Sequence, residues 1–389
     1  MILDDLWLVW ILSSLSFVRF YVYVTAYFST IIAKPLKTRF GTPQIIFQIT
    51  TKGGISVVQE TIDRIHAVCS GIEYKKYEVW VVTDAEERFE NCRTVKVPTE
   101  YSCNAVFKGR ALQYAVELRS LEKKNTESTY IFHLDDESQI TEQTICSILA
   151  FLETNPASIS EGLIVYPLYE GQRIKISNLL DTMRPFCCFE CVDFMSRGNP
   201  AYVHGSNLLV RSDIEEKVGW DNGKTIAEDT LFAVTARRKL GSGVFGWHGG
   251  IIEEKSPNNL RDSFRQRSRW FIGLIQNLKY LTLKERILQV TRALIWSSGF
   301  LSALVSFFSL LIPQNIPGPL RIVFSITSVL WLLSYQIGAY WNGRYLSPLK
   351  RLQYHLMTFV SSPVIGLIEC SMPIVAIVHR PQKFEVIKK

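Results

Sequence analysis

The sequence lacks the features that define several common classes of protein. It has no GxGxxG and no Walker sequence, so it is not predicted to be a dinucleotide oxidoreductase or a P-loop NTPase. It also has no internal repeats and no low-complexity tracts. Charged residues form only 20% of the 389 residues, while hydrophobic residues form 47%. This composition excludes a disordered or collagen-like chain, and it is too apolar for an ordinary soluble enzyme.

Charge is missing altogether from two long segments in the C-terminal quarter. Residues 293–320 and 322–343 contain no Asp, Glu, Lys or Arg. Each segment exceeds the ~20 residues that a helix needs to cross a bilayer. The sequence therefore predicts an integral membrane protein in contact with membrane lipids, and we expect no nucleic-acid partner.

The N-terminal segment predicts a further span. Residues 6–33 are apolar apart from Arg19, and three basic residues follow directly. Because basic residues collect on the cytoplasmic side, we expect this span to run from outside to inside and residues 34–286 to lie in the cytoplasm. The acidic residues 1–5 lack the basic region of a signal peptide.

The C-terminal region predicts two or three more spans, and so a multi-pass protein. Residues 290–312 and 320–341 are apolar stretches joined by a short uncharged loop. The last stretch, 356–378, is interrupted by Glu369, two prolines and a glycine. It forms either a fourth span or a broken, re-entrant segment, which is tolerated only where protein buries it.

Residues 259–286 predict an amphipathic helix, with Leu, Phe and Ile on one face and Arg and Lys over much of the rest. This pattern is typical of a helix in the cytoplasmic membrane interface, and the alternative is a surface helix packed on the soluble domain. The predicted domains are residues 1–33 (a transmembrane helix), 34–258 (the cytoplasmic domain), 259–286 (the interface helix) and 287–389 (the C-terminal transmembrane helices).

The eight cysteines are too scattered for a small disulfide-rich scaffold. We therefore interpret them as reduced thiols that face the cytosol. Cys188-x-x-Cys191 resembles half of a metal site, but no second Cys pair or Cys/His pair follows at zinc spacing. His204 and His248 are interpreted as structural, with a metal-binding role as the alternative.

The cytoplasmic segment alternates between strand and helix patterns. Gln44–Thr51, Glu78–Thr83 and Tyr130–Leu134 are short β-branched and aromatic runs, typical of buried parallel strands. Helical patterns at Ile55–Cys69 and Phe107–Glu122 separate them. The alternation predicts an α/β fold with a doubly wound, mainly parallel sheet, which binds ligands at the carboxyl ends of its strands.

Polar residues follow these strands: Thr50 and Thr51 close the first, Asp84 follows the second, and Asp135-Asp136-Glu137 follows the third. Asp135 and Glu137 point the same way if the strand persists. At that spacing, their oxygens suit Mg²⁺ or Mn²⁺ bridging a nucleotide diphosphate. The alternative interpretation is an acidic turn at the end of a strand.

Two further motifs lie downstream. Glu228-Asp229 opens a predicted helix over 227–240, where the helix dipole alone also favours a carboxylate. Gln266-Arg267-x-Arg269-Trp270 lies in the predicted interface helix. There Arg269 offers a bidentate donor to a phosphate, and Trp270 offers a stacking face to a sugar.

Together and in this order, the motifs resemble those of the processive-type family 2 glycosyltransferases, which include cellulose, chitin and hyaluronan synthases. Their details resemble the egghead-type β-1,4-mannosyltransferases over about residues 44–275. The residues that carry this resemblance are Val81-Val82-Thr83-Asp84, Val97-Pro98-x-Glu100-Tyr101, Phe107-Lys108-x-Arg110-Ala111-Leu112-Gln113-Tyr114, His133-Leu134-Asp135-x-Glu137, Ala227-Glu228-Asp229, Glu254-Lys255-Ser256-Pro257 and Gln266-Arg267-x-Arg269-Trp270. The sequence departs from the family at one motif, with D-D-E in place of D-x-D or D-E-E.

The resemblance implies a GT-A nucleotide-sugar domain on a minimal cellulose-synthase-like membrane base. The implied reaction is inverting transfer of mannose from GDP-mannose to a lipid-linked sugar acceptor, with Mn²⁺ or Mg²⁺ as the cofactor. Asp229 would be the general base and Glu228 would support it. Asp135 and Glu137 would hold the metal ion.

The strand ends, a small residue at 205 and the motifs of the resemblance together indicate which residues contact the substrates. The expected donor-binding residues are Thr50, Thr51, Asp84, Lys108, Asp135, Asp136, Gln266, Arg267, Arg269 and Trp270. Gly205 and Ser206, expected on a strand, would face the acceptor sugar together with Trp270.

Two rival interpretations belong to other classes. A processive polysaccharide synthase that uses a UDP-sugar needs enough helices to wall a polymer channel, and the predicted spans are few. A non-catalytic membrane scaffold would not need the D-D-E, E-D and Q-x-x-R-W motifs, all of which are intact.

Overall fold

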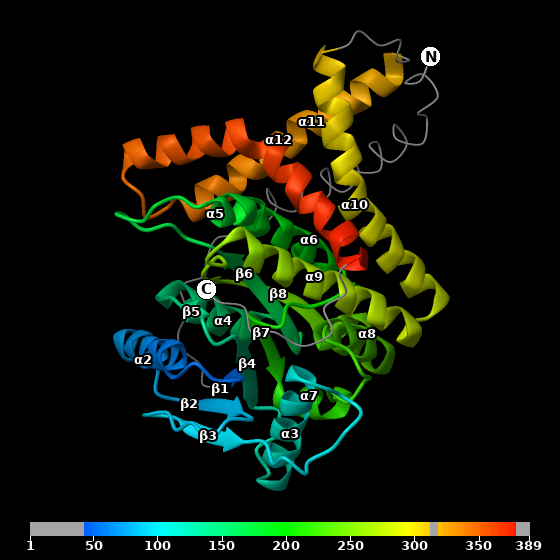
Figure 1. Cartoon of the computed structure of the whole chain (residues 1–389). Helices are drawn as coiled ribbons and strands as arrows, with labels where there is room; N and C mark the ends of the chain where they lie inside the picture. The colour runs from blue at the N-terminus through cyan, green and yellow to red at the C-terminus, as the bar shows by residue number, and fades with distance from the viewer. Residues whose placement is uncertain (1–42, 312–317, 379–389) are drawn as a thin grey trace.

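The computed structural model describes residues 43–311 and 318–378. In this part of the chain, eight strands form one sheet in the order β3-β2-β1-β4-β7-β6-β8-β5 (Figure 1). The strands are β1 (Gln44–Thr51), β2 (Tyr77–Thr83), β3 (Arg93–Lys96), β4 (Thr129–Leu134), β5 (Gln139–Ile140), β6 (Ile159–Val165), β7 (Leu208–Arg211) and β8 (Phe245–Glu253).

Helices connect the strands and continue beyond the sheet. They are α2 (Ile55–Gly71), α3 (Lys108–Leu121), α4 (Glu142–Thr154), α5 (Ile176–Leu180), α6 (Arg184–Ser196), α7 (Ser212–Val218), α8 (Glu228–Leu240), α9 (Leu260–Asn277), α10 (Leu283–Leu311), α11 (Gly318–Asn342) and α12 (Pro348–Val378), with 3-10 turns η1 (Asp181–Met183), η2 (Ser242–Val244) and η3 (Leu278–Tyr280). In Figure 1, α10, α11 and α12 lie at the end of the molecule opposite β1, β2 and β3.

The sheet is mixed. β3, β2, β1 and β4 run parallel, but β7 is antiparallel to both β4 and β6. β8 is parallel to β6, and β5 pairs with β8 in the antiparallel sense. The predicted α/β sheet is therefore confirmed, and it is mixed: the antiparallel pairs all lie beyond β4, where only β6 and β8 are parallel. The three strands predicted from apolar runs all lie in the parallel half.

The continuous apolar run of β1 follows from burial on both faces of the sheet. Side chains alternate along a strand, so neighbours point to opposite faces. Ile45 and Phe47 lie in one core cluster with Val58 of α2, whereas Ile46 lies in another with Ala111 of α3. All of these side chains are buried, which fixes the register of the strand.

The predicted single helix over 259–286 is wrong in its extent. α9 ends at Asn277, and α10 begins only after a 3-10 turn. Gln266 and Arg267 of α9 are buried and Ile275 is exposed, and α9 packs against α12, α5 and α8. Helix α9 therefore buries much of its polar side in protein, mainly against α12.

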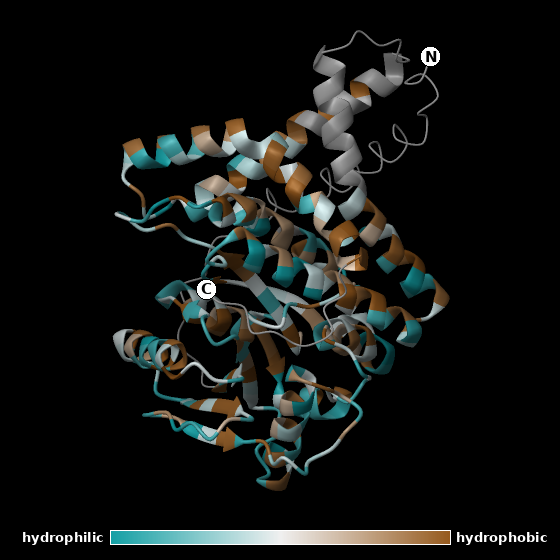
Figure 2. Ribbon diagram, viewed as in Figure 1, coloured by the Kyte–Doolittle hydropathy of each residue, from teal (hydrophilic) through white to brown (hydrophobic). Residues whose placement is uncertain are grey.

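Helix α12 is the one helix in the described residues that is long and apolar enough to cross a membrane, with a mean hydropathy of 1.7 in its most apolar stretch. Only 33% of that stretch is buried inside the protein, and Figure 2 shows hydrophobic residues along the helix. Helix α10 covers residues 290–311 of the predicted span 290–312, and α11 covers the predicted span 320–341. The predicted span over 6–33 lies outside the described residues.

Candidate active site

Lys108 links three segments at the carboxyl end of the parallel strands. Its ammonium group forms an ion pair with Asp135, directly after β4, and donates a hydrogen bond of 2.9 Å to the carbonyl oxygen of Gly205. A Cβ atom added to Gly205 would lie 3.2 Å from Lys108 Nζ and 3.8 Å from Asp229 Oδ2. The structure therefore brings together Lys108, Asp135, Gly205 and Asp229, which are four of the predicted site residues.

Helix α9 holds the Glu228-Asp229 pair in place at the start of α8. The side chain of Gln276 accepts a hydrogen bond from the backbone of Ile226, and that of Asn277 donates one of 2.9 Å to the carbonyl oxygen of Ala227. Gly273 allows a close approach, since a Cβ atom there would lie 2.6 Å from the Cβ of Ala227. Any larger residue at 273 would push α9 away from the backbone that carries the two acids.

The pKa values of Glu228 and Asp229 are both raised. Burial raises the pKa of Glu228, and the neighbouring charge of Asp229 raises it further. Burial also raises the pKa of Asp229, and Asp135 adds to the effect while Lys108 opposes it. Two adjacent carboxyl groups with raised pKa values are typical of a site for general acid–base chemistry.

Two residues with left-handed backbone conformations flank the cluster. Phe107, next to Lys108, has φ of 53°, and Asn207 has φ of 56°. Such conformations are strained for residues other than glycine and persist only where the surroundings impose them. The side chain of Asn207 donates hydrogen bonds of 3.0 Å to the carbonyl oxygens of Leu163 and Gly250, which fix this part of the backbone.

The D-D-E motif lies in a turn. β4 ends at Leu134, and the backbone N–H of Ser138 donates to the carbonyl oxygen of Asp135 at 3.2 Å. The strand does not continue through the motif, so the alternation of a strand does not make Asp135 and Glu137 point the same way. Thr51 Oγ1 lies 3.4 Å from Asp136 Oδ2, while Glu137 is buried.

The donor set of this turn fits a hard divalent cation. It consists of three consecutive carboxylates, and the side chain of Asp135 is partly open to solvent at 37% exposure. Oxygen ligands of this kind suit Mg²⁺ and Mn²⁺. We therefore keep Asp135 and Glu137 as the proposed metal ligands, with Asp136 beside them.

The ends of the first two strands carry the remaining predicted donor-binding residues. Arg110 of α3 donates a hydrogen bond of 2.9 Å to Asp84, which is half open to solvent. Thr50 Oγ1 is buried without a hydrogen-bond partner in the described residues, and Thr51 donates to the carbonyl oxygen of Gly53. Arg110 is not one of the predicted site residues. Its contact with Asp84 makes it a further candidate donor-binding residue at the carboxyl ends of β1 and β2.

In the Q-x-x-R-W motif, the first two residues are buried and the last two are partly exposed. Gln266 is buried and accepts a hydrogen bond of 2.9 Å from Arg267. Arg267 is fully buried and forms ion pairs with Asp181 and Glu369. The structure therefore commits the Arg267 side chain to protein contacts, whereas Arg269 and Trp270 are half-buried.

Arg184 was missed by sequence reasoning. Its guanidinium carbon lies 4.0 Å from the centre of the Trp270 ring and 5.0 Å from that of Tyr166. Cation–π contacts of this kind orient an aromatic ring. No sequence signal near residue 184 indicates the contact, because Arg184 and Trp270 are far apart in the sequence and meet only in the folded chain.

Glu254 joins three parts of the site. It accepts hydrogen bonds from Ser138 at 3.3 Å, from Ser206 at 2.7 Å and from Tyr166 at 3.1 Å. Ser206 is buried and precedes β7, so the prediction that Gly205 and Ser206 lie on a strand is wrong. The signal for Glu254 was its place in the Glu254-Lys255-Ser256-Pro257 motif.

His248 is structural, as interpreted. It is buried, accepts a hydrogen bond from the backbone N–H of Gly250 at 3.0 Å, and its Nε2 lies 3.3 Å from the carbonyl oxygen of Asn207. Burial lowers its pKa to about 3, which keeps the ring neutral.

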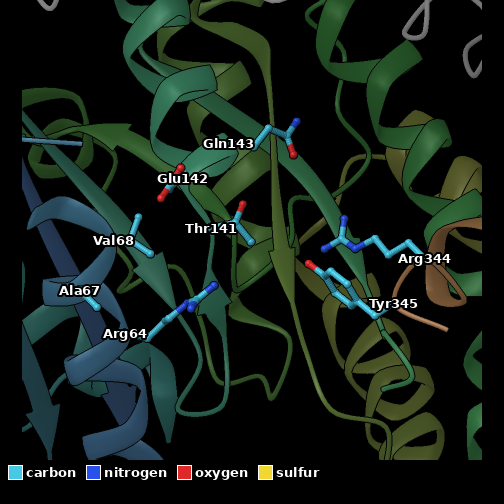
Figure 3. Close-up of a pocket in the computed structure, with 8 residues that line it drawn as sticks. All are labelled: Arg64, Ala67, Val68, Thr141, Glu142, Gln143, Arg344 and Tyr345. Carbon is cyan, nitrogen blue, oxygen red and sulfur yellow. The ribbon is translucent and has the colours of Figure 1, made fainter. Parts of the chain in front are cut away.

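A separate pocket of about 420 Å³ lies between α2, the start of α4 and the loop after α11 (Figure 3). Its lining residues are Arg64, Ala67, Val68, Thr141, Glu142, Gln143, Arg344 and Tyr345. None of them is a predicted site residue. Arg344 and Tyr345 both contact Glu253 at the end of β8, which fixes this loop on the sheet.

The family follows from a comparison with known sequences. The model of the glycosyl transferase family group 2 matches residues 130–342, more than half of the chain. The chain therefore belongs to glycosyltransferase family group 2, and it is an enzyme. The match includes the D-D-E turn, Gly205, the Glu228-Asp229 pair and the Q-x-x-R-W motif.

Within this family, the chain is similar to known β-1,4-mannosyltransferases. The chain is 29% identical over 368 residues to the β-1,4-mannosyltransferase bre-3 of Caenorhabditis elegans, with 89% of this chain and 79% of the relative covered. It is 26% identical over 377 residues to the β-1,4-mannosyltransferase egh of Drosophila melanogaster, with coverage of 89% and 78%. The predicted resemblance to the egghead-type enzymes is thereby confirmed.

A solved structure also resembles the chain. It is the mannosyltransferase PcManGT from Pyrobaculum calidifontis, in complex with GDP-Man and Mn²⁺. The sequence identity is 14% with a TM-score of 0.49, and the alignment covers 95% of this chain and 98% of that one.

Proposed function

We propose that the chain transfers mannose from GDP-mannose to a lipid-linked sugar acceptor, with inversion and a β-linkage. The observation that carries the proposal is the meeting of Lys108, Asp135, Gly205 and Asp229 at the carboxyl end of the parallel strands. The names of the relatives support the mannosyl group and the β-1,4 linkage. The lipid acceptor is supported by α12, which is long and apolar enough to cross a membrane.

Asp229 is the proposed general base. It takes the proton of the acceptor hydroxyl as that oxygen attacks the anomeric carbon opposite the departing diphosphate. A single displacement of this kind inverts the configuration at the carbon. The raised pKa of Asp229 makes it a better proton acceptor than an ordinary carboxylate.

Glu228 supports the base and the sugar. It lies next to Asp229 at the start of α8. A Cβ atom added to Gly109 of α3 would lie only 3.2 Å from the Cβ of Glu228, so the two helices are close together here. Because α3 and α8 are this close, Glu228 stays within reach of the charge on Lys108, which lowers its otherwise raised pKa.

The leaving group needs positive charge. Asp135 and Glu137 would hold a Mn²⁺ or Mg²⁺ ion, which supplies charge compensation for the diphosphate. Lys108 adds a fixed cation beside Asp135, and Arg269 of α9 would add another. Thr50, Thr51 and Asp84 would contact the nucleoside.

The test offers the purified full chain a panel of radiolabelled nucleotide sugars with a lipid extract. The proposal expects transfer from GDP-mannose, and a product that partitions into organic solvent with one added sugar of inverted configuration. Transfer from a UDP-sugar into a ladder of water-soluble polymer would replace the proposal with a processive synthase. A Glu228→Gln/Asp229→Asn chain serves as the inactive control.

A further inference from the structure

Three side chains from separate elements meet beneath the active site. Glu161 lies in β6, Cys191 in α6, and His204 in the segment before β7. One potential ligand atom from each residue lies within 4.8 Å of those from the other two. Glu161 is fully buried, Cys191 is 2% exposed, and the His204 side chain is 16% exposed.

Two polar atoms in this group have no hydrogen-bond partner. Glu161 Oε2 and His204 Nδ1 are both buried and unpaired within the described residues, and Nδ1 lies 3.6 Å from the other oxygen of Glu161. The other ring nitrogen, His204 Nε2, lies 3.8 Å from Cys191 Sγ. A buried polar group without a partner is unfavourable, so two such atoms in one group call for a ligand.

The buried carboxyl group of Glu161 also lacks a basic partner from Lys or Arg in the described residues. The ion pairs found within residues 43–311 and 318–378 include none between Glu161 and a Lys or Arg. A buried carboxylate is stable only when it is paired, protonated or bound to a metal. Burial raises the pKa values of Glu161 and Cys191 and lowers that of His204 to about 4.

We propose that Glu161, Cys191 and His204 form a zinc site. One sulfur, one imidazole nitrogen and one carboxylate oxygen are ligands that Zn²⁺ accepts in tetrahedral geometry, whereas Mg²⁺ and Mn²⁺ prefer oxygen ligands alone. Binding releases the protons of the Cys191 thiol and the Glu161 carboxyl to solvent and leaves the fourth position to a water molecule. This site is separate from the carboxylates of the D-D-E turn.

The site would act on structure rather than on substrate. Gly205 follows His204 directly, and its carbonyl oxygen accepts the hydrogen bond from Lys108. A zinc ion at His204 would therefore fix the backbone that positions Lys108. It would also join α6 to β6, so α6 and the sheet would move as one body.

Cys188 provides the matched control. It is a buried cysteine one turn earlier on α6, and its thiol points to the carbonyl oxygen of Ile164 at 4.0 Å instead of to His204. In the sequence, Cys188-x-x-Cys191 resembles half of a metal site. In the structure, only Cys191 of these two lies with Glu161 and His204.

The experiment measures zinc in the full-length protein, purified in detergent and exchanged into metal-free buffer, by mass spectrometry of the metal. We expect one zinc ion per chain in the native protein, in Cys188→Ser and in Asp135→Asn. We expect none in Cys191→Ser or His204→Gln. A native protein without zinc, or a Cys191→Ser protein that keeps it, would overturn the proposal.

A Cys191→Ser protein could lose zinc because it misfolds rather than because a ligand is missing. Cobalt substitution avoids this problem, because it tests the Cys191 ligand in the native protein. Native protein and Cys188→Ser produced with Co²⁺ should show a thiolate-to-cobalt charge-transfer band in the near ultraviolet. Thermal unfolding and GDP binding report whether Cys191→Ser remains folded. A cobalt-loaded native protein that lacks the band would exclude Cys191 as a ligand, whatever the variants do.

Discussion

Arg267 of α9 donates a hydrogen bond to Glu369 of α12, with Nε and Oε2 3.1 Å apart. The same guanidinium pairs with Asp181 of η1, and both Arg267 and Asp181 are fully buried. The acidic residue that interrupts the last apolar stretch therefore has a partner. The contact links the helix that carries Gln266 and Trp270 to the candidate membrane helix, so movement of α12 would reach the active site through one side chain.

The first prediction concerns this ion pair. Removing one partner of a buried pair leaves an unpaired charge and costs about 3–5 kcal/mol. Asp181→Asn should therefore lower the melting temperature strongly, and Glu369→Gln should lower it less because Glu369 is partly exposed. Arg197→Ala, which breaks an exposed pair with Asp193, is the control and should change little. Equal melting temperatures for Asp181→Asn and the control would show that the pair contributes nothing.

The second prediction concerns the metal ion. EDTA should abolish transfer, and Mn²⁺ or Mg²⁺ should restore it. Asp135→Asn should weaken binding of the nucleotide sugar only when the cation is present, because it removes one proposed ligand. Asp63→Asn, at an exposed position of α2, is the matched substitution and should bind normally. Full activity in the presence of chelator would sink the assignment of Asp135 and Glu137.

The third prediction concerns pH. Burial raises the pKa values of Glu228 and Asp229, and the proposed base must be ionised. As pH falls, kcat/KM should therefore decrease at a pH well above ~4, the ordinary value for a carboxyl group. The apparent pKa belongs to the pair, because the two groups interact. A profile that stays flat down to pH ~4 would contradict the raised pKa values.

The same shift has a consequence for stability. A group whose pKa is raised in the folded state contributes stability below its unfolded pKa and loses that contribution as pH rises through the folded value. Ionisation of the pair as pH rises through the raised pKa values therefore destabilises the fold. Asp229→Asn should keep or raise the melting temperature at neutral pH, and this is a control for the loss of activity in that variant.

The fourth prediction concerns Gly205. A methyl group there would lie 3.2 Å from Lys108 Nζ and 3.8 Å from Asp229 Oδ2. Gly205→Ala should therefore displace the ammonium group and lower the rate of transfer, while the overall fold is kept. Gly243→Ala is the matched control, since a methyl group at that position meets nothing within 4 Å. Comparable kcat values for the two variants would show that Lys108 does not depend on the space at Gly205.

Some parts of the structure follow from sequence and others depend on distant partners. The strands β1, β2 and β4 and the helices α2, α3 and α8 were predicted because their apolar periodicity is local. The extent of α9 was not, because its polar residues are buried by partners such as Glu369, which is 102 residues away from Arg267. The short strand β7 carries too few residues for a period to appear.

The candidate site divides in the same way. The residues that close strands, such as Asp135, were predicted from the rule that ligands bind at strand ends. The orientation within the D-D-E motif was not, because Ser138 accepts a hydrogen bond from the backbone N–H of Asp135 and turns the chain. Arg184 could not be predicted, since its contact with Trp270 exists only in the folded chain.

The most direct test of the account is the comparison of Asp229→Asn with the native enzyme. The variant removes a proton acceptor and leaves the shape and the donor contacts nearly unchanged. The account predicts that kcat falls by roughly 10²–10⁴-fold, while the affinity for GDP stays within a few fold of the native value. An Asp229→Asn enzyme with near-normal kcat would contradict the assignment of the base and would make Glu228 the next residue to test.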